Sequence, residues 1–110
     1  MKAIRIVLPL ALLVPAPAFA GNIFGNLREG GRSVGQGVQV QVTCGSVHPP
    51  PTMTDQYGAY SLAVPGGKCA LSVGYKGRTT PSFAIVSSDD PARYDFDLVS
   101  ENGRYVLKRR

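Results

Sequence analysis

The fold of this chain is decided by the stretch Val38-Gln39-Val40-Gln41-Val42-Thr43-Cys44, in which apolar and polar residues alternate up to a cysteine. Successive side chains of a β-strand point to opposite faces, so the valines and Cys44 share one face of this stretch. A second stretch, Cys69-Ala70-Leu71-Ser72-Val73-Gly74-Tyr75, alternates in the same way and starts with a cysteine on its apolar face. These two stretches predict strands that each bury one face and direct both cysteines toward the core.

Cys44 and Cys69 are the only cysteines of the chain, and we predict that they form a disulfide bond. Closing a loop of about 26 residues would stabilise the fold by about 3.5 kcal/mol through the lost entropy of the unfolded chain. The alternative is a redox-active pair, but such pairs usually have two intervening residues and lie at the start of a helix. The spacing therefore favours a structural disulfide.

Residues 1–20 have the pattern of a secretory signal peptide. Lys2 and Arg5 form a basic start, an apolar run follows over 6–14, and Ala18-Phe19-Ala20 is a small-x-small cleavage site before Gly21. The apolar run is shorter than the about 20 residues of a membrane-spanning helix. We therefore predict a mature domain over 21–110 that has no membrane span and is periplasmic or secreted, with an uncleaved membrane anchor as the alternative.

Composition limits the functions open to this domain. Without Lys2 and Arg5 the chain has ten basic and seven acidic residues, so its net charge falls from +5 to +3, too weak a charge to suggest nucleic-acid binding. One histidine and two cysteines leave most catalytic and metal-binding constellations without their residues. We expect a single small domain that is not an enzyme and uses no cofactor, and the sequence does not indicate its oligomeric state.

Alternation with a period of two recurs along 21–110, and no segment has the 3.6-residue period of an amphipathic helix. Glycine and proline interrupt the alternation at short intervals, as turns require. Seven or eight short strands predict an all-β sandwich, because two sheets can cover each other's apolar faces. The expected strands are 22–28, 37–44, 52–54, 59–64, 68–75, 82–87, 92–99 and 104–108.

The last two expected strands flank Asn102-Gly103, which favours a type I′ turn because both positions need a positive φ. The resulting register predicts three opposite-charge pairs, Glu101–Arg104, Asp97–Lys108 and Asp95–Arg110. The acidic strand thus accounts for most of the basic chain end, the edge formed by Arg104, Lys108, Arg109 and Arg110. Contact of this edge with an anionic surface is the alternative.

One segment resembles a known family. Thr54-Asp55-Gln56-Tyr57-Gly58-Ala59-Tyr60, followed by an alternating strand, Pro65-Gly66-Gly67 and a second alternating strand, is similar to the core of carboxypeptidase regulatory-like domains of the transthyretin-like group. The resemblance extends over about 23–75, and it departs from the family at Cys69 and in the proline-rich loop over 47–53. It implies a seven- to eight-stranded transthyretin-like Greek-key β-sandwich with a non-catalytic accessory role.

The same structural group includes hydroxyisourate hydrolases, which use several histidines and a C-terminal Tyr-Arg-Gly-Ser signature. This chain has one histidine and ends in Leu107-Lys108-Arg109-Arg110, so the resemblance does not carry that activity. Ser46 and His48 lack the orienting acid and oxyanion donors of a catalytic triad.

The loop over 47–53 is the best candidate for partner binding, because three consecutive prolines stiffen it and lower the entropy lost on binding. The candidate residues are Val47, His48, Pro49, Pro50, Pro51 and Met53. An inert, stiff connection is an equally good interpretation of the same loop.

Two further groups of residues have a chemical alternative. Asp89 and Asp90, joined by Asp55, would offer oxygen ligands to calcium, although an exposed turn explains the pair as well. The parity of the strands places Tyr60, Tyr75 and Tyr94 mostly in the core, where they cannot form a carbohydrate platform.

Two functions follow for this chain. The first is a secreted or periplasmic module with a structural or protein-binding accessory role in the cell envelope, whose partner is an envelope protein or polysaccharide. The second is a recognition module for glycans or anionic envelope polymers.

Overall fold

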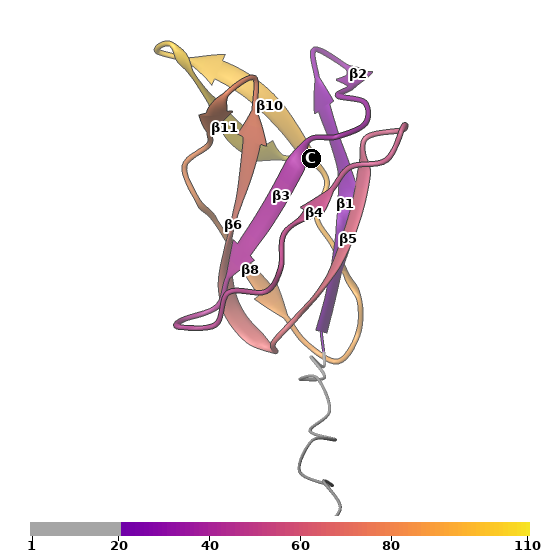
Figure 1. Cartoon of the computed structure of the whole chain (residues 1–110), viewed down its shortest axis with the longest axis vertical. Helices are drawn as coiled ribbons and strands as arrows, with labels where there is room; N and C mark the ends of the chain where they lie inside the picture. The colour runs from indigo at the N-terminus through magenta and orange to yellow at the C-terminus, as the bar shows by residue number, and fades with distance from the viewer. Residues whose placement is uncertain (1–20) are drawn as a thin grey trace, which may run out of the picture.

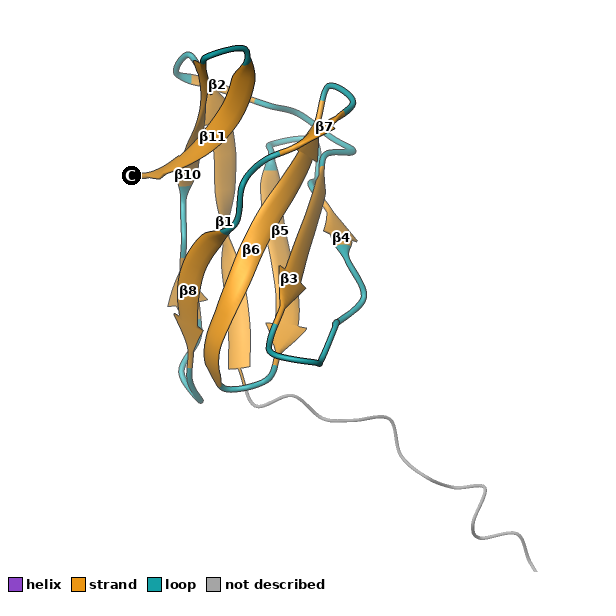
Figure 2. Ribbon diagram, turned by 90° about the vertical axis from the view of Figure 1, so that its left-hand side faces the viewer, coloured by secondary structure: helices purple, strands orange, loops and turns teal. Residues whose placement is uncertain are grey.

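A computed structural model describes residues 21–110, so the predicted signal peptide over 1–20 lies outside the described residues. Eleven β-strands form two sheets that pack face to face as a sandwich (Figures 1 and 2). Between residues 21 and 110 there is no helix long and apolar enough to cross a membrane. The predicted all-β sandwich is confirmed.

The first sheet is built around the long strand β1 (Gly21–Glu29). Its order is β11 (Arg104–Arg109), β10 (Phe96–Glu101), β1 and β2 (Arg32–Ser33). Strands β5 (Ala59–Val64) and β9 (Ala92–Arg93) also pair with β1, the former antiparallel and the latter parallel. β1 is therefore the central strand of this layer.

The second sheet is built around β6 (Gly67–Tyr75). Its order is β4 (Thr52–Met53), β3 (Gln39–Thr43), β6 and β7 (Arg78–Thr79), and β8 (Phe83–Ser87) pairs with β6 as well. The pairing of β3 with β6 brings Thr43 opposite Ala70, so the cysteines that follow and precede these residues face each other. The predicted Cys44–Cys69 disulfide forms there, with a Cα–Cα distance of 4.3 Å.

The strand count differs from the seven or eight that the sequence predicts. All eight expected segments contain strand, but the expected strand over 92–99 is divided into β9 and β10. In addition, β2 and β7 each extend a hairpin by two residues next to turns with positive φ, at Gly30-Gly31 and Lys76-Gly77. Two residues are too few to show an alternation, which is why the sequence pattern does not reveal these strands.

The core lies between the inner faces of the two sheets. The buried side chains alternate along the long strands, as expected, and nine of them are almost completely enclosed. These nine are Phe96, Ile23, Leu27, Leu71, Ile85, Val40, Val42, Val64 and Val73. Tyr60 and Tyr94 are buried as predicted, whereas Tyr75 is only partly buried against the core.

The register of the last hairpin agrees with the prediction, and Asn102 and Gly103 have φ values of 53° and 81°. The charge pairs do not follow the directly opposite positions. Lys108 Nζ lies 3.1 Å from Glu101 Oε2, Arg110 Nε lies 3.1 Å from Asp97 Oδ1, and Asp95 pairs with Arg93 instead. The long basic side chains reach along the strand, so the predicted Glu101–Arg104, Asp97–Lys108 and Asp95–Arg110 ion pairs are wrong.

The break between β9 and β10 is an ordered interruption of the ladder on β1. A regular parallel ladder would bond Tyr94 to both Phe24 and Asn26. The Tyr94 N–H does donate to the Phe24 carbonyl at 2.8 Å, but the Asn26 N–H donates to Asp95 Oδ1 at 2.9 Å. The Tyr94 carbonyl instead turns inward and accepts a 2.6 Å hydrogen bond from the Tyr60 hydroxyl.

Gly25 makes this interruption possible. A Cβ atom at this position would lie 2.0 Å from the Tyr94 carbonyl oxygen, so no other residue fits without a backbone shift. The side chain of Asp95 thus takes the place of a backbone acceptor, and the two ladder groups that the break separates, the Asn26 N–H and the Tyr94 carbonyl, each have a partner.

Candidate functional site

The end of the sandwich opposite Gly21, called the distal end here, carries the turn 55–58 between β4 and β5 (Figure 1). Asp55 Oδ1 accepts hydrogen bonds from the N–H groups of Tyr57 at 2.8 Å and Ala59 at 3.0 Å. Gly58 has a φ of 76°, and a Cβ there would lie 2.6 Å from Ser33 Oγ. The turn is therefore held by an aspartate cap and depends on a glycine with positive φ.

The buried residue Thr54 holds the neighbouring loop in place. Its hydroxyl donates to the Gly35 carbonyl at 2.6 Å and accepts from the Val38 N–H at 2.9 Å. The Gly37 N–H donates to the Thr54 carbonyl at 3.0 Å. The Thr54 N–H also donates to the Val38 carbonyl at 2.9 Å, so four hydrogen bonds fix the loop before β3 against the turn after β4.

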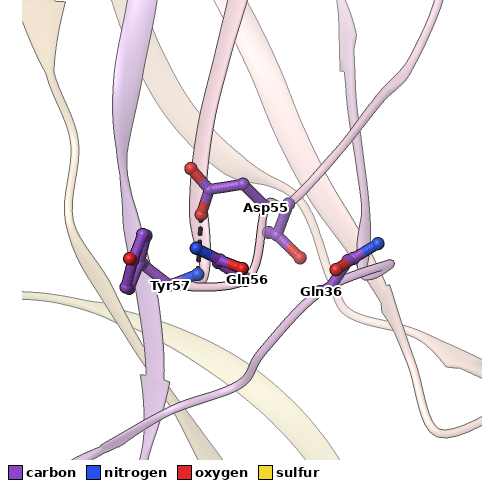
Figure 3. Close-up of a pocket in the computed structure, with 5 residues that line it drawn as sticks. Gln36, Asp55, Gln56 and Tyr57 are labelled. Carbon is purple, nitrogen blue, oxygen red and sulfur yellow. Dashed lines mark hydrogen bonds between the residues drawn. The ribbon is translucent and has the colours of Figure 1, made fainter.

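The turn and the loop enclose a shallow depression of about 330 Å³, lined by Gln36, Thr54, Asp55, Gln56 and Tyr57 (Figure 3). The Tyr57 side chain is 70% exposed, and in the view of Figure 3 Gln56 lies between it and Gln36. Thr54 and one Asp55 oxygen are engaged in the turn, so the groups left to face a ligand are two amides, a phenol and the second oxygen of the Asp55 carboxylate. An exposed ring beside two amides and one carboxylate suits a polar ligand without negative charge.

A second depression of similar volume, about 330 Å³, lies on the other side of the same segments. Met53, which is 58% exposed, and Gln39 contribute to it together with the glycine-rich turn between β6 and β7. The two depressions are neighbours. Gln36 and Thr54 line the first, and the residues next to them in the chain, Gly37 and Met53, line the second.

Most of the predicted partner-binding loop lies away from these depressions. Val47 is 40% exposed and pairs with Cys44 through two backbone hydrogen bonds of 2.9 and 3.0 Å. Pro49 is buried, while His48 and the other two prolines are exposed. Of the candidate residues, Met53 alone lines either depression.

The predicted acidic candidates are not brought together. Asp55 caps the distal turn, whereas Asp89 and Asp90 lie in the connection from β8 to β9, at the opposite end of the sandwich. Within residues 21–110 no three His, Cys, Asp or Glu side chains are placed to hold a metal ion.

The basic end of the chain is largely engaged in internal contacts. Lys108 and Arg110 form the ion pairs with Glu101 and Asp97 described above. The Arg109 guanidinium lies 4.1 Å from the centre of the Tyr94 ring and donates to the Arg93 carbonyl at 2.9 Å. These contacts weaken the case for an anion-binding edge.

A titratable cluster joins the two sheets at the distal end, and the sequence pattern did not point to it. The Tyr75 hydroxyl donates to Glu29 Oε1 at 2.5 Å, and Lys76 Nζ lies 3.4 Å from the same oxygen. The Tyr75 and Tyr105 rings pack edge to face at 5.0 Å. Glu29 and Tyr105 belong to the first sheet and Tyr75 to the second, so the cluster connects the two sheets at the distal end.

The contacts of this cluster shift the titration of its members. The hydrogen bond from Tyr75 holds the pKa of Glu29 below its ordinary value. Burial, followed by the hydrogen bond to Glu29, raises the pKa of Tyr75. Hydrogen bonds with Tyr105 and Glu29 raise the pKa of Lys76. All three shifts favour the states that form these contacts at neutral pH, namely an ionised Glu29, a neutral Tyr75 and a charged Lys76. Because the three hydrogen-bonded pairs of the cluster are 29 to 47 residues apart in sequence, only the fold brings them together.

No protein-family model matches the chain, and the search of the curated proteins finds no significant relative.

Proposed function

We propose that this chain is a non-catalytic β-sandwich module of the cell envelope, secreted or periplasmic, which recognises an envelope component through its distal end. The depression lined by Gln36, Gln56 and Tyr57 carries this proposal, because exposed recognition groups there are mounted on a turn and a loop held by the hydrogen bonds of Thr54 and Asp55. Rigid scaffolds that present their binding groups on loops lose little entropy when they bind.

The resemblance to carboxypeptidase regulatory-like domains supports an accessory role. The aspartate cap and the glycine with positive φ of this chain have folding roles, which fits the non-catalytic module that the resemblance implies. We propose membership of that family and of its transthyretin-like group on the basis of these residues. The disulfide and the sandwich are compatible with an extracellular location.

A protein partner is tested by capture from an envelope extract with the exported protein as bait. Tyr57→Ala should reduce capture of a specific partner by about tenfold, in line with the loss of an exposed aromatic anchor. Replacing Val47 and His48 by glycine and serine provides the matched control, because this part of the loop lines neither depression. Equal capture by the wild type and Tyr57→Ala would move the site away from the distal end.

A glycan ligand is the second candidate, and the amides, the phenol and the single carboxylate of the depression favour a neutral glycan over a polyanion. Two amides beside a tyrosine ring match the hydroxyl groups and apolar faces of a neutral sugar. Co-sedimentation with an insoluble neutral polysaccharide, compared with a polyanionic one, tests this candidate. We expect binding to the neutral polymer that Gln36→Ala and Gln56→Ala weaken, and retention on the polyanion alone would contradict it.

A further inference from the structure

The outer strands of the two sheets differ in how their unpaired backbone groups are protected, and one of these edges has no protection. An exposed, uncharged edge strand is a template for pairing with another chain, so proteins normally protect their edges with charges, prolines or covering groups. Four strands border the sandwich along its length, namely β11, β8, β3 with its short neighbour β4, and β5.

Three of these edges are protected. β11 carries basic side chains at Arg104, Lys108 and Arg109. On β8, the Val86 N–H donates to the Tyr94 hydroxyl at 2.9 Å, and that hydroxyl lies 3.3 Å from the Val86 carbonyl. On β3, the register with β4 continued by two residues beyond the Val40–Thr52 pair would bring Val42 opposite Pro50, which has no N–H group to donate.

The edge of β5 has no such protection. The Leu27 N–H donates to the Gly58 carbonyl at 2.9 Å, and in the antiparallel register of β1 and β5 this makes every second residue of β5 bond to β1. The backbone groups of Ala59, Ser61 and Ala63 therefore point away from β1. Those of Ala59 are taken by Asp55, through its carboxylate at 3.0 Å and its N–H at 2.9 Å.

Ser61 and Ala63 thus present two N–H and two C=O groups at the edge. The side chains of both are exposed, and within the described part of the chain no backbone or side-chain partner is found for these N–H groups. Since β5 pairs with β1 alone, these groups are left to water or to another strand (Figure 1).

This edge is complementary to itself. An antiparallel β5 from a second molecule, related by a two-fold axis through Leu62, would place Ser61 opposite Ala63 on both sides of the axis. Two donors from each copy then find two acceptors on the other, which makes four backbone hydrogen bonds. The pairing ends after these four bonds. The next pair on either side would be Ala59 of one molecule and Pro65 of the other, but Asp55 already bonds the backbone groups of Ala59 and Pro65 has no N–H group.

The charge distribution also selects a second copy as the occupant. A two-fold contact brings like charges together, so a patch that pairs with itself must be neutral. β5 has the sequence Ala59-Tyr60-Ser61-Leu62-Ala63-Val64, without a charged residue, and the outward residues of β1 that face it are Asn22, Phe24 and Asn26. We propose that the protein forms a homodimer in which two β5 strands pair antiparallel and join the first sheets of two molecules.

Sedimentation equilibrium of the exported protein, up to about 1 mM, measures the association, since four hydrogen bonds at the centre of a small contact predict a dissociation constant in the micromolar to millimolar range. Amide hydrogen exchange at the same concentrations locates the contact. The amides of Ser61 and Ala63 should exchange more slowly as the concentration rises, and those of Tyr105 and Leu107, which point outward from the protected edge of β11, should not.

Ala63→Pro removes the outward N–H at the edge and leaves the ladder to β1 intact. It deletes two of the four bonds, so the dissociation constant should rise by about tenfold or more. Ala84→Pro is the matched control, because Ala84 lies two residues from Val86 and also directs its N–H away from its partner strand. Ser61→Lys, which sets like charges against each other and cannot disturb the backbone, should likewise give a monomer.

A wild-type protein that remains monomeric at the highest concentration would overturn the proposal. So would a dimer that persists in both Ala63→Pro and Ser61→Lys, or a protection of the Ser61 and Ala63 amides that does not depend on concentration. The test does not involve the distal depression, so its outcome is independent of the proposed function.

Discussion

Replacing Tyr60 by phenylalanine tests the interruption between β9 and β10. The Tyr60 hydroxyl is the partner of the Tyr94 carbonyl, at 2.6 Å in the core, because Asp95 has taken the place of that carbonyl in the ladder. The substitution keeps the ring and its apolar contacts and removes the hydroxyl alone. It therefore leaves one buried carbonyl oxygen without a donor.

Leaving a buried backbone acceptor without a partner costs about 1–3 kcal/mol. We expect the free energy of unfolding to fall by about 2 kcal/mol, which is a substantial part of the stability of a small domain. In a domain of this size each kcal/mol corresponds to about 4–8 °C, so Tm should fall by about 10 °C. Tyr57→Phe is the matched control, because its hydroxyl belongs to a side chain that is 70% exposed.

The assay is urea unfolding at neutral pH, with the disulfide intact in both variants. A second readout is the dependence of the unfolding free energy on pH above pH 10. Burial raises the pKa of Tyr60 above its ordinary value of 10, so the neutral phenol stabilises the fold fully below pH 10 and this contribution is lost as the pH rises further. Tyr60→Phe should remove that share of the pH dependence. A loss of stability no larger than that of Tyr57→Phe would refute the assignment of the Tyr60 hydroxyl to the interruption.

Three further measurements follow from the fold. Replacing both cysteines of the Cys44–Cys69 disulfide by alanine should lower the unfolding free energy by about 3.5 kcal/mol, because the bond closes a loop with a sequence separation of 25; a loss below about 1 kcal/mol in urea unfolding would contradict this. Exchanging the charges of Asp97 and Arg110 together should recover most of the loss of either single reversal, all within about 1 kcal/mol and less in high salt, and a double-mutant cycle without recovery would reject the pair. Because hydrogen bonding lowers the pKa of Glu29, its contribution is present above the ordinary glutamate pKa and is lost as the pH falls through the lowered value; Glu29→Gln should flatten the decline of Tm in acid, and identical acid profiles would count against the cluster.

The alternation of residues was enough to predict the long strands and the disulfide. Val40, Val42 and Leu71 are on the buried face because the period of a strand is two, and this period also sets the direction of both cysteines. The Asn102-Gly103 turn fixed the register of its hairpin for a local reason, since two consecutive residues with positive φ allow one connection. Such features depend on neighbours in the chain, and the sequence contains them fully.

The features that matter for the proposed functions depend on residues far apart in the chain. The stiff loop over 47–53 was the predicted site of partner binding, but Pro49 is buried and the depression forms where Gln36 meets the turn 55–58. The ion pairs of the last hairpin differ from those predicted from its register. The length of the side chains and the twist of the strands select the partner, and the register describes neither of them.

The sequence by itself determined that this protein is an all-β sandwich with a Cys44–Cys69 disulfide, because strand period and turn chemistry are local properties. Only the tertiary structure decided which backbone groups remain without a neighbour. It divided one expected strand at Tyr94 and Asp95, because the carboxylate and the Tyr60 hydroxyl from another strand replaced ladder bonds. It also left the edge of β5 open, because the order of strands within a sheet depends on how the whole chain packs its apolar faces.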